Sequence, residues 1–251
     1  YLVSDVLFGT IIIVSGLTLK QLWVRSIVAM LGQEEIKRKA VQKELQIFET
    51  LETFIPAGIR KIIKTRVNEG HPASSVIAQL ASPMEQPLAV LYSDYRDYSR
   101  RSADVAFVTH ELIESSTPII DYAEKQDGIV QNRCDSLLIT YIHGDVINNI
   151  CRALITGLLS AKSEMTRVKR KGQSNPDRFI IVTSGVGIFC SLGGASRNEI
   201  TIAGKPTNLA ARMDELTKRP EIREILSLEP GILLDFTTKK ALLTSGIDLG
   251  L

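Results

Sequence analysis

The stretch Thr201-Ile-Ala-Gly-Lys-Pro-Thr-Asn-Leu-Ala-Ala-Arg212 decides how the rest of this chain is interpreted. Its first residues are typical of the end of a strand, Gly204 of the turn that follows, and Pro206 of the first turn of a helix. In that helix Asn208 and Arg212 are four residues apart, so their side chains project from one face. An amide placed this way beside a guanidinium suits holding a sugar next to a phosphate. A surface helix with a polar face gives the same pattern.

Size, charge and cysteine content limit the class of protein. The 251 residues allow one domain of ordinary size plus an additional segment. The 30 Lys and Arg residues nearly balance 28 Asp and Glu residues, so we expect no nucleic-acid partner. Cys134, Cys151 and Cys190 lack the spacing of a metal site. This usage fits a reducing compartment and argues against a disulfide framework.

The beginning of the chain is apolar and then basic. Residues 6–19 carry no charge, and Lys20, Trp23 and Arg25 follow them. Fourteen residues are fewer than the roughly 20 that a membrane span needs, but this flanking pattern is typical of its cytoplasmic end. We therefore expect residues 1–32 to be the end of a transmembrane helix that holds the chain at a membrane, with the rest in the cytoplasm. A buried or interfacial helix is the alternative.

A charged, helix-forming segment follows over residues 33–66. Its apolar residues recur at spacings of four and three, in the manner of a short coiled coil: Val41, Leu45, Phe48, Leu51 and Ile55. Such a segment could transmit a signal between a membrane and a domain, and a plain dimerising spacer is equally compatible. Residues 67–86 are rich in Gly, Pro and Ser, which predicts a linker.

Residues 87–251 form the predicted globular domain, in which strands and helices alternate. We expect strands at 88–92, 179–182, 186–190 and 231–236, a hairpin at 128–142, and helices at 102–125 and 145–170. The buried positions expected in the two helices are Val105, Val108 and Leu112, then Ile147, Ile150, Leu154 and Leu158. Because the hairpin interrupts a parallel order, the pattern predicts an α+β fold with a mixed, ferredoxin-like sheet flanked by helices.

Two carboxylates fall where strands end. Asp94 follows the buried run 88–92, and Asp135 lies at the turn of the predicted hairpin. A carboxylate at the tip of a buried strand is costly unless it is paired or binds a metal. Both residues are therefore candidates for a functional site.

Four stretches, in this order, resemble the signatures of class III nucleotidyl cyclases. Residues 89–99 (AVLYSDYRDYS) resemble VLFSDIRGFT, and residues 128–138 (GIVQNRCDSLL) resemble the hairpin GxVxKxxGDGLL. Residues 183–193 (TSGVGIFCSLG) are similar to HTGEVVVGNIG, and residues 201–212 are similar to TVIGDTVNLAAR. Each stretch alone is weak, but four in register over about 87–220 are specific.

The resemblance implies a class III cyclase catalytic domain, preceded by a transmembrane and coiled-coil helix, with a two-metal site. Asp94 and Asp135 match the carboxylates that hold two Mg²⁺ or Mn²⁺ ions, with the carbonyl of Tyr95 as a backbone ligand. Asn208 matches the residue that orients the ribose, and Arg212 the residue that neutralises charge on the α-phosphate. In the family each subunit supplies half of a site, which implies a head-to-tail homodimer.

Base choice in the family depends on two positions, which fall here on Gln131 and Thr201. Thr201 fits the adenine pattern, whereas Gln131 fits neither pattern, and its amide can donate or accept. The expected reaction is the conversion of ATP to 3′,5′-cyclic AMP and pyrophosphate. A guanylyl cyclase, or one with relaxed base choice that takes GTP, is the first alternative.

Several departures from the signatures support a further alternative, a catalytically weak cyclase-homology module for dimerisation or nucleotide sensing. Asp97 replaces a glycine, and Cys134 and Ser136 flank Asp135 where glycines are usual. Lys205-Pro206 replaces the usual Asp-Thr. The lysine that grips the triphosphate is not identified, because Lys239 and Lys240 lack the expected setting.

Overall fold

The computed structural model describes most of the chain, in seven ranges: 24–39, 42–43, 55–96, 98–172, 178–194, 197–228 and 231–247. The chain divides into two compact units, Tyr1–Phe54 and Ile55–Leu251. In the first unit, residues 24–39 form a helix. None of the helices in these ranges has the length and apolar character that crossing a membrane requires. The apolar segment 6–19 and most of the predicted coiled-coil positions lie outside them.

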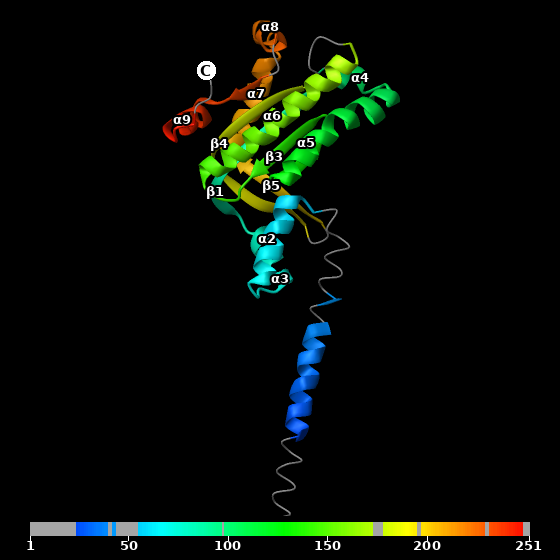
Figure 1. Ribbon diagram of the computed structural model, residues 1–251, viewed down its shortest axis with the longest axis vertical. Helices are drawn as coiled ribbons and strands as arrows, with labels where there is room; N and C mark the ends of the chain where they lie inside the picture. The colour runs from blue at the N-terminus through cyan, green and yellow to red at the C-terminus, as the bar shows by residue number, and fades with distance from the viewer. Residues whose placement is uncertain are drawn as a thin grey trace, which may run out of the picture. The chain divides into compact units, whose positions relative to one another are not determined.

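The second unit is built on a six-stranded sheet (Figure 1). Five strands have the order β2-β3-β1-β4-β5, and β6 pairs with Ile180–Val182 of β4, a part of that strand that β5 does not pair with. The strands are β1 (Met84–Tyr95), β2 (Ile129–Arg133), β3 (Ser136–Tyr141), β4 (Arg178–Gly194), β5 (Arg197–Gly204) and β6 (Ile232–Leu234). All neighbours are antiparallel except β4 and β6, which are parallel. This mixed sheet, with its 2-3-1-4 order, confirms the predicted ferredoxin-like α+β fold.

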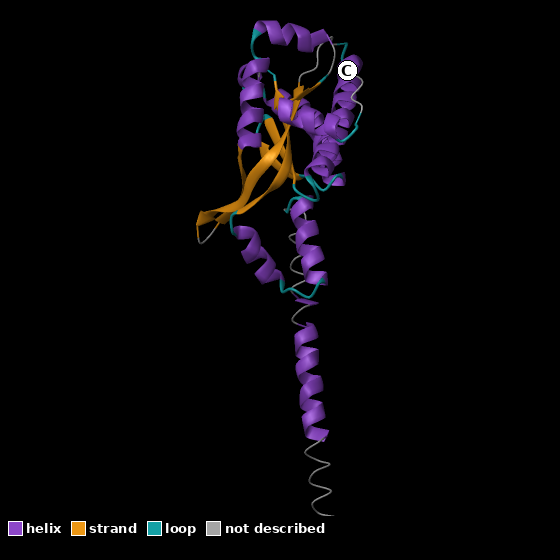
Figure 2. Ribbon diagram, turned by 90° about the vertical axis from the view of Figure 1, so that its left-hand side faces the viewer, coloured by secondary structure: helices purple, strands orange, loops and turns teal. Residues whose placement is uncertain are grey.

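Helices cover both faces of the sheet (Figure 2). The helices described in this unit are α2 (Ala57–Asn68), α3 (Ala73–Ala81), α4 (Tyr98–Arg101), the π-helix η2 (Phe107–Leu112), α5 (Ile113–Lys125), α6 (Val146–Arg170), α7 (Lys205–Thr217), α8 (Pro220–Leu228) and α9 (Phe236–Thr244). In β1, Ala89 and Leu91 are buried in one core with residues of α5 and α6. On the opposite face, the hydroxyl of Thr183 donates to the carbonyl of Pro206 in α7 over 2.9 Å.

Three of the predicted strands need correction. The strands expected at 179–182 and 186–190 are one 17-residue strand, β4, which passes through Gly185 with a φ of 152°. Without a side chain, Gly185 continues the strand at a backbone angle that other residues rarely adopt. The strand expected at 231–236 has only three residues, because Asp235 caps the start of α9 by accepting from the amides of Thr237 and Thr238.

The predicted buried positions of the two long helices are also partly wrong. Val105 is 75% exposed, whereas Phe107 is 4% exposed. The π-helical turn over residues 107–112 has a longer repeat than an α-helix, so a pattern based on 3.6 residues does not continue through it. In α6, Ile150 is buried as expected, but Leu158 is 62% exposed. Most inward positions from Thr156 to Arg167 of α6 are instead small or polar residues.

The segment predicted as a linker, 67–86, contains helix α3 and the start of β1. Val76 and Leu80 of α3 are buried, so the helix is fixed by packing despite its Gly- and Pro-rich flanks. The compact unit therefore begins at Ile55, before the expected boundary at 87. Helix α2 belongs to it, and Lys61 of α2 forms an ion pair of 2.5 Å with Asp127.

The packing of α2 depends on a close approach at Gly58. A Cβ atom there would lie 2.6 Å from the carbonyl oxygen of Asp127 and 2.8 Å from a side-chain carbon of Ile129. Gly58→Ala is therefore expected to lower the free energy of unfolding by about 1–3 kcal/mol, the usual cost of overpacking. Urea unfolding measures this change. Gly231→Ala is the matched control, since its Cβ would meet no atom within 4 Å. Equal effects of the two substitutions would contradict the assigned contact.

Candidate functional site

The two candidate carboxylates come together because β1 and β3 are neighbours. The antiparallel register pairs Ser93 with Leu137 at the end of the ladder. Two residues further along each strand, the amide of Tyr95 donates to the carbonyl of Asp135 over 3.2 Å. Asp94 at the end of β1 and Asp135 in the β2–β3 turn therefore lie at the same end of the sheet.

The β2–β3 turn keeps a glycine-type backbone although no glycine is present. Cys134 has a φ of 62°, one of only two positive values among non-glycine residues in the described ranges. For a residue with a side chain, this left-handed conformation costs about 1–2 kcal/mol. The Cys134 side chain is exposed, so no buried contact of that side chain compensates for the strain. The pairing of β2 with β3, which ends at Arg133 and Ser136, fixes the position of Asp135 in the turn.

The environment of Asp94 is unfavourable for its negative charge. Burial, followed by the charges of Asp214 and Asp135, raises the pKa of the Asp94 carboxyl to about 6, while Lys218 and Arg178 act in the opposite direction. Asp214 reaches this site from α7 and is 5% exposed. The end of β1 thus holds a concentration of negative charge that nearby cations only partly offset.

A cavity of about 220 Å³ opens beside Asp94. Its lining comes from the ends of β1, β4 and α7: Asp94, Tyr95, Arg96, Phe179, Asp214, Thr217 and Lys218. Lys218 forms an ion pair of 2.9 Å with Asp214, and this hydrogen bond is the main reason why the pKa of Lys218 is raised. The Arg96 guanidinium lies 3.3 Å from the centre of the Phe179 ring. The cavity therefore presents both signs of charge.

The donor set fits a hard divalent cation. The donors predicted from the sequence are the Asp94 and Asp135 carboxylates and the backbone carbonyl of Tyr95, so every donor would be oxygen. Within the described ranges no group of three or more His, Cys, Asp or Glu residues is placed to hold a metal. A cation would offset the repulsion from Asp214 and Asp135, which adds to the effect of burial in raising the pKa of Asp94.

The remaining predicted residues lie elsewhere in the chain. Asn208 and Arg212 are both exposed on α7, whose opposite face is buried, and this agrees with the predicted common face. Gln131 is half-buried in β2, and Thr201 is half-buried in β5 opposite Cys190. None of these four residues lines the cavity beside Asp94. Within one chain, Asp94 and Asp135 therefore lie at the same end of the sheet, and the other four predicted residues lie outside the cavity beside Asp94.

Sequence reasoning did not identify Asp214, Lys218 or Arg178 as parts of this region. Asp214 shares the buried face of α7 with Pro206 and Ala210, at intervals of four residues. A carboxylate on the apolar face of a helix was the available signal for Asp214, and Lys218 follows it at i+4. Arg178 precedes a predicted strand, and no local pattern indicates that it is 4% exposed.

Comparison with solved structures identifies the fold. The chain is similar to a bacterial light-regulated adenylyl cyclase, with a TM-score of 0.59 and 18% identity over 80% of this chain and 56% of that one. It is also similar to the adenylyl cyclase CyaB from P. aeruginosa, with a TM-score of 0.53 and 18% identity over 65% of this chain and 83% of that one. The chain is also similar to the guanylyl cyclase Cya2, with a TM-score of 0.51 and 18% identity over 63% of this chain and 79% of that one.

These neighbours show that the chain has the fold of a class III cyclase catalytic domain. The sequence matches no family model, and it matches no curated protein. The fold agrees with the resemblance of the four sequence stretches, although adenylyl and guanylyl cyclases are both among the neighbours.

The charge on Asp94 gives a stability test. Its folded-state pKa of about 6 lies above the ordinary value of 3.8, so ionisation disfavours folding as the pH rises between these values, and the full penalty applies above pH 6. In metal-free protein at pH 7.5, Asp94→Asn should raise the melting temperature by about 2–4 °C, the shift that about 1 kcal/mol gives at this size. The difference should vanish near pH 4.

Thermal unfolding across this pH range, with Asp121→Asn as an exposed control, checks the prediction. Mn²⁺ should stabilise the parent chain and leave Asp94→Asn nearly unchanged, because the substitution removes a ligand. Destabilisation by Asp94→Asn at pH 7.5 would contradict this description of the acidic site.

Proposed function

We propose that the chain is a nucleotidyl cyclase that converts ATP to 3′,5′-cyclic AMP and pyrophosphate. The observation that carries the proposal is the placement of Asp94 and Asp135 at adjoining strand ends in a cyclase-type fold. The raised pKa of Asp94, caused by burial and by Asp214 and Asp135, supports a site that is adapted to a cation.

Asp94, Asp135 and the carbonyl of Tyr95 would hold two Mg²⁺ or Mn²⁺ ions. Bound there, the ions would supply a lowered pKa at the ribose 3′-hydroxyl and charge neutralisation at the phosphates. The cavity beside Asp94 gives space for phosphate groups, and its cations, Arg96 and Lys218, would add electrostatic attraction.

The second half of the site would come from another copy of this chain. Asn208 would orient the ribose by hydrogen bonds, and Arg212 would neutralise the charge that develops on the α-phosphate. Both side chains are exposed on α7, available to a partner. A head-to-tail homodimer would bring each Asn208–Arg212 pair to the carboxylates of its partner and so form two equivalent sites.

Gln131 and Thr201 would contact the base. The Thr201 hydroxyl and the Gln131 amide can each donate and accept, which permits adenine. Because the same groups can serve guanine, GTP is the second candidate substrate. We further propose that segment 6–19 attaches the chain to a membrane, with the catalytic domain on the cytoplasmic side.

The strained β2–β3 turn favours the other candidate function, a catalytically weak module that binds nucleotide or dimerises. The turn that carries Asp135 needs a left-handed residue, and Cys134 occupies this position at a conformational cost. A less well-ordered Asp135 would retain binding and lose rate, since small displacements in an active site reduce rate strongly.

Product analysis distinguishes these functions. The purified dimer, incubated with Mn²⁺ and either ATP or GTP, should release cyclic AMP from ATP. Asp135→Ala should abolish this product, and Arg212→Ala should lower the rate by about 10²–10³-fold, the usual effect of losing one transition-state donor. Asp121→Ala, at an exposed position on α5, is the matched control. Nucleotide binding without any cyclic product would instead support the binding module.

Mixing experiments test the shared site. Asp94→Ala chains should be inactive alone, and Arg212→Ala chains should keep only a rate that is reduced by about 10²–10³-fold. When mixed at equal amounts they should recover up to about a quarter of the parent activity, because half of the dimers are mixed and each keeps one intact site. The mixture of Asp94→Ala with Asp135→Ala is the control and should stay inactive, since both substitutions affect the same half. Heterodimers that form without activity would contradict the head-to-tail arrangement.

A further inference from the structure

A buried arginine lies directly behind the acidic site. Arg178 is the first residue of β4 and pairs with Tyr95 at the end of β1. Its side chain lies on the sheet face that α5 and α6 cover, on the same side as Ile180 and Val182. Those two inward positions are apolar, and Arg178, at 4% exposure, is the charged exception in the row. A charge at such a position is costly unless its hydrogen bonds are satisfied.

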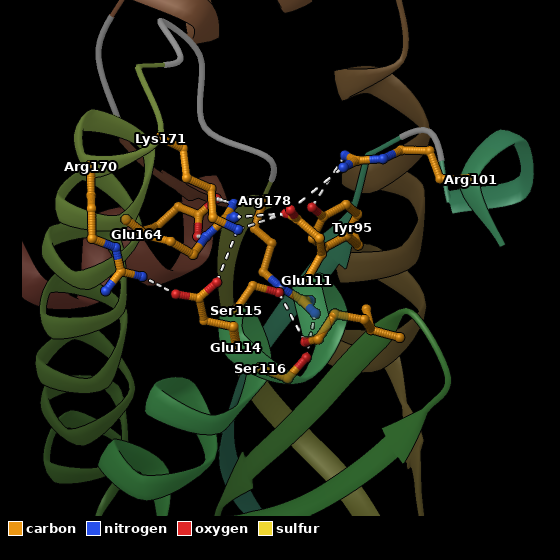
Figure 3. A network of polar contacts seen from close by, with 12 residues as sticks. Tyr95, Arg101, Glu111, Glu114, Ser115, Ser116, Glu164, Arg170, Lys171 and Arg178 are labelled. Atoms are coloured by element: carbon orange, nitrogen blue, oxygen red, sulfur yellow. Dashed lines mark hydrogen bonds and ion pairs between the residues drawn. The ribbon is translucent and has the colours of Figure 1, made fainter. Parts of the chain in front are cut away.

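The guanidinium of Arg178 donates to three acceptors, two on adjacent serines of α5 and one in the β2–β3 turn. Its Nε donates to the Ser115 hydroxyl over 3.0 Å, and one Nη donates to the hydroxyl of Ser116. Its other Nη donates to the backbone carbonyl of Asp135 over 3.0 Å. Figure 3 shows this arginine amid the polar side chains of α5 and α6. The fixed fork of a guanidinium can satisfy three such directions at once.

The carbonyl of Asp135 accepts a second hydrogen bond, from the amide of Tyr95 over 3.2 Å. The Arg178 guanidinium also lies 5.1 Å from the centre of the Tyr95 ring. Tyr95 is 1% exposed, so the ring is a fixed surface. The β2–β3 turn is therefore held at one atom by both the end of β1 and the start of β4.

The groups around the Arg178 guanidinium are themselves held by hydrogen bonds. The Ser115 hydroxyl donates to the carbonyl of Leu112 over 3.0 Å, which leaves its oxygen to accept from Arg178. Beside it, Arg167 makes a two-bond ion pair with Glu164, at 2.9 and 2.8 Å. Burial lowers the pKa of Arg178 to about 10, and the charge of Glu164 opposes this shift, so the guanidinium stays positive at neutral pH.

Resting on the function proposed above, we propose that Arg178 is a positioning residue. It holds the Asp135 turn against the end of β1 and so sets the separation between the Asp94 and Asp135 carboxylates. The strain at Cys134 would favour a shift of the turn. The hydrogen bonds to the carbonyl of Asp135 oppose this shift. Replacing a residue that orients a metal ligand through hydrogen bonds commonly lowers metal affinity by about 10–100-fold. We expect a loss of this order when Arg178 is replaced.

Two readouts test the role of Arg178 with the full chain. The first is hydrogen exchange at the Tyr95 amide, which donates to the held carbonyl. Arg178→Met should speed this exchange by about 10-fold or more, because the turn becomes free to open. The second is Mn²⁺ affinity measured by calorimetry, which should fall by about 10–100-fold. Arg178→Lys keeps the charge without the planar fork, so intermediate values are expected for both readouts.

Arg101→Met is the matched control. Arg101 also approaches the Tyr95 ring, at 5.4 Å, and donates to the Tyr95 hydroxyl over 3.2 Å. That hydroxyl is at the opposite end of Tyr95 from the amide that donates to the carbonyl of Asp135. Removing the Arg101 guanidinium should therefore leave both readouts within about twofold of the parent chain, whatever its effect on melting temperature.

Parent-like exchange and Mn²⁺ affinity in Arg178→Met would overturn the positioning role. If that variant does not fold, Arg178→Lys decides the matter, and parent-like values for both readouts would overturn it. A parent chain that binds no Mn²⁺ would contradict the proposed function instead. Exchange at Tyr95 would still show whether Arg178 holds the turn, since that readout needs no metal.

Discussion

The antiparallel pairing of β1 with β3 is the constraint on which the site depends. Its register brings the backbone of Asp135 to the amide of Tyr95 and thereby places Asp135 beside Asp94. A slip of one residue would turn every side chain of one strand to the opposite face. Apolar residues of both strands prevent this slip, because Leu91 and Ile139 are fully buried in the core beneath α5 and α6. Core packing and the geometry of the acidic site therefore have the same physical origin.

The two faces of the sheet have different roles around this pairing. On one face, α5 and α6 bury apolar side chains and surround Arg178 with hydroxyl and charged groups. On the other, α7 contributes Asp214 and Lys218 to the cavity beside Asp94 and exposes Asn208 and Arg212 on its outer side. The same helix thus lines the cavity beside Asp94 and leaves Asn208 and Arg212 exposed, as the proposed homodimer requires.

The sequence was sufficient for the fold and for the acidic pair. Alternation, helical spacing and the hairpin turn are local patterns, and they predict the mixed sheet and the strand ends that carry Asp94 and Asp135. The π-turn before α5 and the burial of Arg178 depend on distant neighbours, so no local pattern predicts them. Cys134 illustrates why the fold matches cyclase structures while the sequence matches no family model: the structure keeps the backbone shape of a glycine without the glycine.

In the proposed function, the end of β1 and the β2–β3 turn form a cation site for a nucleotide. A crystal of the chain grown with Mn²⁺ and a non-cyclisable ATP analogue, measured at the manganese absorption edge, tests it most directly. Anomalous density between the carboxylates of Asp94 and Asp135, with the α7 residues Asn208 and Arg212 of a second copy facing the nucleotide, is the predicted result. Bound nucleotide without manganese at these carboxylates, or manganese at other residues only, would contradict the account.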